Sequence, residues 1–92
     1  MNTEIYITKR DGKREAFSIE KIKSAISKAF LSVGGFATQE TLTGILSRLS
    51  ISNGTTVEEI QNQVEVALMA EQYFSVAKSF MLYRQKHLED RE

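Results

Sequence analysis

Four basic side chains and two acidic ones surround a single turn signal near the start of the chain. The segment reads Thr8-Lys9-Arg10-Asp11-Gly12-Lys13-Arg14-Glu15. Asp-Gly between apolar-containing runs is one of the strongest short signals for a β-hairpin. A chain reversal this rich in cations indicates an anion-binding site. The plain alternative is a hairpin tip whose charges are solvated.

The register of this hairpin decides which side chains share a face. A two-residue loop would pair Ile7 with Ala16 and divide the apolar residues between two faces. A three-residue loop, residues 10–12 with Gly12 left-handed, gives other pairs: Lys9 with Lys13, Ile7 with Glu15, and Ile5 with Phe17. We prefer the second register, because a sheet buries one face and its apolar residues must agree on that face. This face offers an apolar floor, a cation and a carboxylate, which suits a flat base with a phosphate tail.

Beyond the hairpin, apolar residues recur at helical spacing and predict four helices. We expect them at about residues 19–31, 38–50, 56–69 and 72–88. Ser18 is the expected N-cap of the first helix, and Thr56 with Glu59 has the capping-box pattern at the start of the third. No glycine or proline marks the boundary between the last two helices. The sequence therefore predicts one α+β domain, residues 1–92, with a small N-terminal β-hairpin (residues 4–17) packed on a four-helix bundle.

The opening turn of the first helix is a second candidate anion site. It follows the second strand without a loop, so its free backbone amides lie at the edge of the apolar face. Lys21 lies in this turn, and the geometry brings it near Lys9 as a grip for a triphosphate. The alternative is that Lys21 is an ordinary exposed helix lysine. The sequence has no glycine-rich phosphate loop of the P-loop or Rossmann kind, so a nucleotide site here must be of another design.

Composition narrows the classes of function. The 92 residues carry twelve Lys plus Arg and twelve Asp plus Glu, so no global field favours nucleic acid or an anionic membrane. The absence of cysteine excludes disulfides and thiol catalysis, and it fits a reducing cytoplasm, where we expect the protein. The single His87 has no second histidine near it, so we expect no metal site. No apolar run approaches transmembrane length, and the first residues lack a secretion signal.

Three groups of residues carry motifs in a fixed order along the chain. They are Ile7-Thr8-Lys9-Arg10-Asp11-Gly12 with Glu15, Phe17 and Lys21-Ile22; Val57-Glu58-Glu59-Ile60-Gln61-Asn62-Gln63-Val64-Glu65; and Val76-Ala77-Lys78 with Tyr83-Arg84. Together they cover nearly the whole chain. They resemble the opening, the third helix and the closing helix of the ATP-cone domain found at the N-terminus of ribonucleotide reductase large subunits.

The resemblance implies an allosteric domain that binds ATP or dATP, with Mg²⁺ as a candidate companion ion. Carried over residue by residue, it assigns phosphate contacts to Lys9, Arg10 and Lys21 and the polar edge of the nucleotide to Glu15. It assigns the base to Ile7, Phe17 and Ile22, and the neighbourhood of the sugar to Thr56 and Gln61. Ser18 stands where some members have asparagine. The implied partners are the catalytic domain of the parent chain and another reductase subunit.

Ribonucleotide reduction, as the resemblance describes it, uses cysteine radical and thiol chemistry. A chain without cysteine cannot perform it, so we expect a regulatory domain that is not an enzyme on its own. A transcriptional regulator of reductase genes carries the same cone behind a cysteine-rich zinc ribbon, which this chain lacks. We therefore favour an N-terminal fragment of a reductase catalytic subunit that regulates its overall activity.

Two further alternatives remain open at this point. A small nucleic-acid binder would use the basic hairpin as a wing, but the second and third expected helices carry Arg48 as their single cation. A helical interaction module would pair with another subunit through the last two helices. Their bulky side chains exceed what one stripe can bury: Tyr73, Phe74, Phe80, Met81 and Tyr83.

Overall fold

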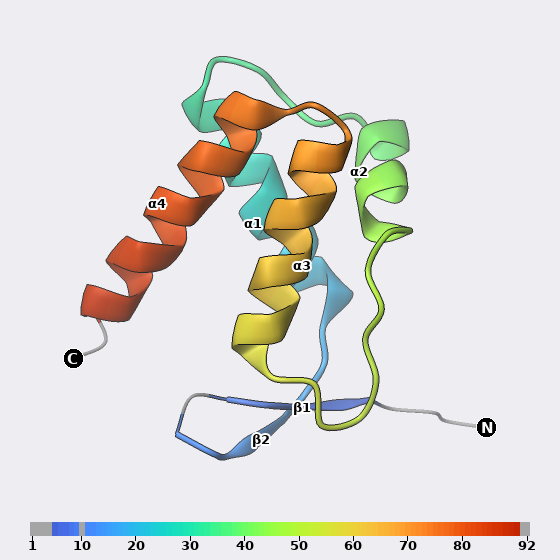
Figure 1. Cartoon of the computed structure of the whole chain (residues 1–92), viewed down its shortest axis with the longest axis vertical. Helices are drawn as coiled ribbons and strands as arrows, with labels where there is room; N and C mark the ends of the chain where they lie inside the picture. Colours follow the sequence, from blue (N-terminus) through green and yellow to red (C-terminus); the bar gives the residue numbers. More distant parts are fainter. Residues whose placement is uncertain (1–4, 10, 91–92) are drawn as a thin grey trace.

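The computed structural model describes residues 5–9 and 11–90, with side chains as far as Arg84. A two-stranded antiparallel sheet is formed by β1 (Tyr6–Thr8) and β2 (Arg14–Ala16). The helices that follow are α1 (Ile19–Ser32), α2 (Gln39–Leu46), α3 (Val57–Ala70) and α4 (Phe74–Asp90). Figure 1 shows the hairpin lying across one end of the helices. The small α+β fold expected from the sequence is confirmed.

The hairpin adopts the three-residue-loop register. Ile7 faces Glu15 across the two strands. The Lys9 amide donates to the Lys13 carbonyl at 2.8 Å, and the Phe17 amide donates to the Ile5 carbonyl at 2.8 Å. Gly12 has a φ of 87°, the left-handed conformation that glycine adopts without steric cost. The predicted pairing is therefore confirmed, while residue 4 and the loop residue Arg10 lie outside the described residues.

The hairpin is tied to the loop that precedes α3. The Thr8 amide donates to the Thr55 carbonyl at 3.0 Å, and the Gly54 amide donates to the Tyr6 carbonyl at 2.9 Å. The Tyr6 amide in turn donates to Asn53 Oδ1 at 2.9 Å. A two-stranded hairpin is marginal alone, so these bonds give β1 a partner on its second edge. The start of α3 is thereby fixed next to the hairpin.

The helix starts follow local sequence signals to different degrees. At the start of α3, the Glu59 amide donates to Thr56 Oγ1 at 3.0 Å, and the Thr56 amide donates to Glu59 Oε1 at 3.2 Å. This is the predicted capping box. Ser18 occupies the N-cap position of α1, but its side chain makes no capping hydrogen bond. Position 18 is therefore a cap in backbone geometry only.

The second helix ends earlier than its apolar stripe predicts. We expected it to reach residue 50, whereas α2 ends at Leu46. The amides of Arg48 and Leu49 donate to carbonyls three residues back, each at 3.1 Å, which tightens and ends the helix. The side chain of Gln63 on α3 then binds both backbone groups of Ser50, at 2.6 and 3.0 Å. This contact with α3 holds the chain in a non-helical path.

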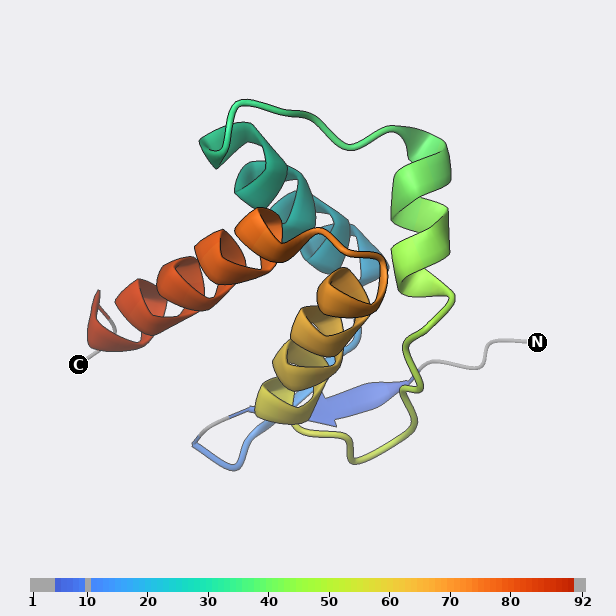
Figure 2. The ribbon, with the colours of Figure 1, turned by 45° about the horizontal axis from the view of Figure 1, so that its top comes forward.

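The turn between α3 and α4 brings these two helices together at one end. Gln72 adopts a positive φ of 69°, and the Tyr73 amide donates to the Leu68 carbonyl at 2.8 Å. The last helix therefore begins at Phe74, later than the predicted residue 72. Figures 1 and 2 show α3 and α4 meeting at this turn and diverging toward the hairpin.

The apolar core lies between the four helices. Its most completely buried side chains come from three helices: Ile26, Ile45, Val64 and Leu68. Phe30 packs edge-on against Tyr73 with ring centroids 5.1 Å apart. Among the bulky residues of the last helices, Phe80 is buried, whereas the side chains of Phe74 and Met81 are 63% and 36% exposed. In the described part of the chain, no helix combines the length and the apolar character needed to cross a membrane.

Candidate functional site

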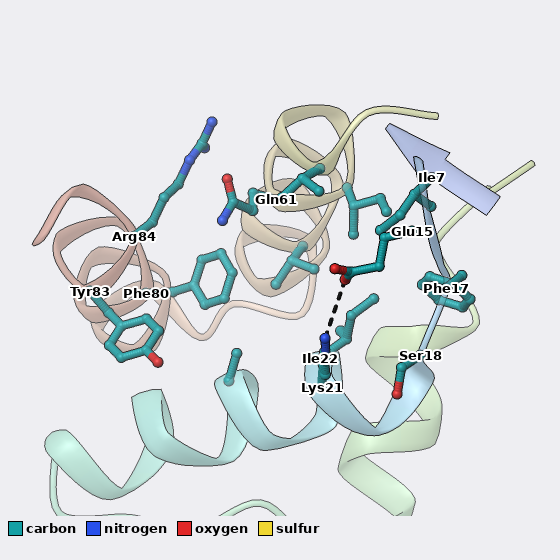
Figure 3. Close-up of a pocket in the computed structure, with 14 residues that line it drawn as sticks. Ile7, Glu15, Phe17, Ser18, Lys21, Ile22, Gln61, Phe80, Tyr83 and Arg84 are labelled. Carbon is teal, nitrogen blue, oxygen red and sulfur yellow. Dashed lines mark hydrogen bonds and ion pairs between the residues drawn. The ribbon is translucent and has the colours of Figure 1, made fainter. Parts of the chain in front are cut away.

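A cavity of about 180 Å³ lies where α3 and α4 have diverged, bounded by the hairpin and by α1 (Figure 3). Most of its wall is apolar, and the larger apolar residues are Ile7, Phe17, Ile22, Ile60, Val64 and Phe80. Its polar lining is Glu15, Ser18, Lys21, Gln61, Tyr83 and Arg84. These six apolar residues form a slot that suits a flat apolar group, and a few charged and polar side chains lie beside it.

Each wall follows from the periodicity of its element. Ile7 and Glu15 are cross-strand partners, so their side chains leave the hairpin on the same face. On α3 the lining residues recur at the spacing of one helical face: Val57, Ile60, Gln61 and Val64. On α1 the lining residues Lys21, Ile22 and Ala25 come from the first two turns. Strand pairing and helical periodicity thus determine which residues share a face of each element, and the packing of the helices brings these faces together.

Two lysines share the carboxylate of Glu15. Lys21 Nζ lies 3.2 Å from Glu15 Oε2, and Lys9 Nζ lies 3.6 Å from Glu15 Oε1. The hydrogen bond from Lys21, and then the charges of Lys21 and Lys9, hold the pKa of Glu15 below its ordinary value despite partial desolvation. The carboxylate is therefore ionised at neutral pH. The three groups carry a net positive charge at the rim of the cavity.

The size of the cavity limits what it can enclose. Pockets for drug-sized ligands are usually about 300 Å³ or larger. At about 180 Å³ this cavity is smaller, so a ligand that carries a long charged tail would extend beyond it. The tail of such a ligand would lie at the rim. Lys21 is available there, because its side chain is 72% exposed.

The structure gathers most of the predicted site residues around this cavity. Those that line it are Ile7, Glu15, Phe17, Lys21, Ile22 and Gln61. Lys9 reaches the site through its ion pair with Glu15. Thr56 is absent from the lining, and its hydroxyl already donates to Glu59 Oε1 at 3.0 Å within the capping box. Arg10 lies outside the described residues, so its role stays a prediction.

Three residues of α4 in the cavity wall were missing from the predicted site: Phe80, Tyr83 and Arg84. Arg84 Nη1 donates to Glu65 Oε2 at 2.7 Å and to Asn62 Oδ1 at 2.9 Å, both on α3. The sequence did contain a signal, because Arg84 continues the apolar stripe of the last helix at helical spacing from Phe80. A charged residue on a buried face needs a partner. The stripe did not reveal which partner.

Comparison with protein families settles the relationship of the chain. The family model of the ATP cone domain matches residues 5–89. The chain belongs to the ATP-cone family. The hairpin, α1 and α3 lie within the matched range, and so does α4 except for its last residue, so the match includes every element that forms the cavity.

Two curated relatives of this ATP-cone are similar to it over most of its length. A vitamin B12-dependent ribonucleoside-diphosphate reductase of Thermoplasma acidophilum is 40% identical over 94 aligned positions, covering 94% of this chain. The alpha subunit of a ribonucleoside-diphosphate reductase of Chlamydia pneumoniae is 35% identical and covers 88% of it. The cone spans only 12% and 9% of the lengths of these relatives.

Proposed function

We propose that this cone binds an adenine nucleotide, ATP or dATP, in the cavity between the hairpin, α1, α3 and α4. One observation carries the proposal: an apolar slot ends at two lysines that share a carboxylate. In the proposed complex the base lies in the slot against Ile7, Phe17 and Ile22. The phosphates lie outside the slot, against Lys9 and Lys21, and Arg10 is a further candidate contact from the sequence.

Glu15 would change partners when the nucleotide binds. In the free domain its carboxylate neutralises part of the charge of Lys9 and Lys21. Phosphate oxygens are stronger competitors for both ammonium groups because they carry more charge. The released carboxylate can then accept a hydrogen bond from the amino group at the edge of adenine. Guanine presents a carbonyl oxygen at the corresponding position, which would repel the carboxylate, so Glu15 favours adenine.

The sugar would lie between base and phosphates, near α3. Gln61 is well placed for it, because its amide group lines the cavity (Figure 3). Thr56 is a weaker candidate in this geometry, since a sugar contact would have to compete with its capping bonds to Glu59. An amide can donate to or accept from a ribose hydroxyl. Gln61 is thus the residue we expect to respond to the difference between ATP and dATP.

Mg²⁺ would be held mainly by the phosphates. Among the described residues, no group of three or more His, Cys, Asp or Glu side chains is close enough to hold a metal ion. Glu15, the carboxylate at the cavity, is already paired with two lysines. Mg²⁺ usually keeps several waters and binds through substrate phosphates with few protein ligands. The cone would therefore receive the ion together with the nucleotide.

The test is calorimetric titration of the domain with ATP, dATP, GTP, inorganic tripolyphosphate and a short DNA duplex. We expect ATP and dATP to bind more tightly than GTP and tripolyphosphate. Equal affinity for tripolyphosphate and ATP would show that the site recognises only the charge of the phosphates and not the base. Tight binding of the duplex would favour the nucleic-acid alternative, although α2 and α3 contain no Lys or Arg and Arg48 is bound to Glu71 at 2.7 Å.

We further propose that the bound nucleotide regulates the overall activity of a ribonucleotide reductase. The relatives named above carry this activity in their names, and the cone itself has no cysteine for the chemistry. A ligand can shift an equilibrium only by binding its two states differently. We expect ATP and dATP to act oppositely, although they differ by only one hydroxyl. That hydroxyl must then alter how the cone contacts the catalytic part or another subunit.

The candidate contact surface includes the exposed side chains of Phe74 and Met81 on α4. Light scattering of the intact parent enzyme with ATP and then with dATP tests this output. We expect the molecular mass of the enzyme assembly with ATP bound to differ from its mass with dATP bound. Identical masses with both nucleotides bound would leave a change within one subunit as the output.

A further inference from the structure

Arg84 joins the two helices that form opposite sides of the proposed nucleotide site. It lies one turn beyond Phe80 on α4, and both residues line the cavity. Its guanidinium donates through Nη1 to Glu65 at 2.7 Å and to Asn62 at 2.9 Å. The side chains of Arg84 and Glu65 are only 18% and 14% exposed. The pair is therefore much less screened by water than an ordinary surface ion pair.

The position of this pair differs from that of the lysine cluster. Figure 3 places Arg84 across the cavity from Glu15 and Lys21, with Gln61 between the two sides. The charges of Arg84 and Glu65 cancel each other, so the pair adds little to the positive rim. Its geometry suits a mechanical role. It connects the turn of α4 that carries Tyr83 to the turn of α3 that carries Gln61.

We propose that Arg84 is a positioning residue that sets the width of the cavity by holding α4 against α3. Near the α3–α4 turn, buried core side chains hold the two helices together, among them Leu68, Val76 and Ala77. At the depth of the cavity Val64 and Phe80 are still buried, but the slot opens beside them. A charged pair with a third, amide partner can span the helices there without filling the slot. This inference rests on the proposed nucleotide site.

This role predicts which contacts of the ligand are lost when Arg84 is changed. A wider slot loses contact with the flat base, while Lys9 and Lys21 still meet the phosphates. Loss of the pair should therefore weaken ATP and leave tripolyphosphate unaffected. A direct phosphate contact by Arg84 would weaken both ligands together. The ratio of the two affinities thus separates positioning from phosphate binding.

The experiment compares the full chain with the double variant Glu65→Gln/Arg84→Gln and the charge-exchanged variant Glu65→Arg/Arg84→Glu. The glutamine pair removes both charges together, which avoids leaving one buried charge without a partner. We expect it to weaken ATP about tenfold and to change tripolyphosphate affinity less than about twofold. The charge-exchanged pair should recover ATP affinity to within about threefold of wild type. Glu40→Gln/Lys78→Gln removes one exposed carboxylate and one exposed ammonium group outside the pair and the cavity lining, so it is the control for the loss of two opposite charges.

The outcomes separate this inference from the proposed function. Wild-type ATP affinity in the folded glutamine variant ends the positioning role and leaves the nucleotide site intact. Equal loss for ATP and tripolyphosphate assigns Arg84 to the phosphates and overturns positioning as well. A wild-type domain that binds neither ligand ends the proposed function, and this inference with it. If the glutamine variant does not fold, the charge-exchanged pair still decides the question.

Discussion

The end of the bundle next to the α3–α4 turn and the end next to the hairpin use the same helices but bury them differently. At the turn end, Ile26 and Leu68 are completely enclosed. At the hairpin end, Phe17 and Ile22 stay partly exposed around a cavity, with charged groups beside them. The first arrangement contributes stability because it removes apolar surface from water. The second leaves apolar surface uncovered, which a ligand can cover instead.

If this division is correct, a core substitution should affect stability far more than it affects binding. Leu68→Ala removes a fully buried side chain and should lower the free energy of unfolding by about 2–5 kcal/mol. Val66→Ala is the matched control, because Val66 lies on the same helix with its side chain 61% exposed, and we expect a change within about 0.5 kcal/mol. Urea unfolding measures the change in the free energy of unfolding for each variant. Equal losses of stability in the two variants would show that the burial of Leu68 is not what stabilises this end of the bundle.

Substitutions at the rim should show the reverse pattern. Lys9→Ala and Lys21→Ala should each weaken ATP binding by roughly ten- to hundredfold, because a hydrogen bond to a charged group is worth about 1.5–3 kcal/mol. Stability should change by less than about 1 kcal/mol, as for other exposed ion pairs. Lys78→Ala, an exposed lysine of α4 outside the cavity lining, is the control. If calorimetry gave all three variants the same small loss, the attraction would be diffuse and the phosphate assignment wrong.

The smallest effect concerns the acid response of the rim. The pKa of Glu15 is lowered in the folded state, chiefly by the hydrogen bond from Lys21. Its contribution to stability is therefore present above the ordinary value of 4.5 and is lost as the pH falls through the lower folded value. The stability gap between the wild type and Glu15→Gln should narrow over this range. Urea midpoints at several pH values measure it, and a gap that stays constant would contradict the ion-pair geometry.

The sequence predicted those parts of the fold that depend on neighbouring residues. Asp11-Gly12 and the shared face of Ile5, Ile7 and Phe17 were enough to choose the hairpin register. The capping box at Thr56 needs only a hydroxyl and a carboxylate three residues apart, so it was also predictable. The same local face explains why Ile7, Glu15 and Phe17 were correctly placed around one cavity.

The parts that were not predicted depend on distant residues. The end of α2 is fixed by Gln63, whose side chain binds Ser50 thirteen positions away. The partner of Arg84 lies 19 positions earlier on another helix. Periodicity marks Arg84 as lying on a buried face, but it contains no information about which groups face it. Those contacts arise only when the helices pack, and with them the α4 side of the cavity.

The bonds between β1 and residues 53–55 have a consequence for how the cavity can open. The pairing of β1 with β2 is local, whereas these bonds join positions 47 apart, as between Tyr6 and Asn53, and attach the hairpin to the helices. The buried core cluster of the helices contains no residue of the hairpin. The same bonds can also break on their own, since a few hydrogen bonds at an edge open at lower cost than a packed core. Detachment of the hairpin would remove the wall that Ile7, Glu15 and Phe17 form while the helices stay folded, and it would open the cavity to a ligand.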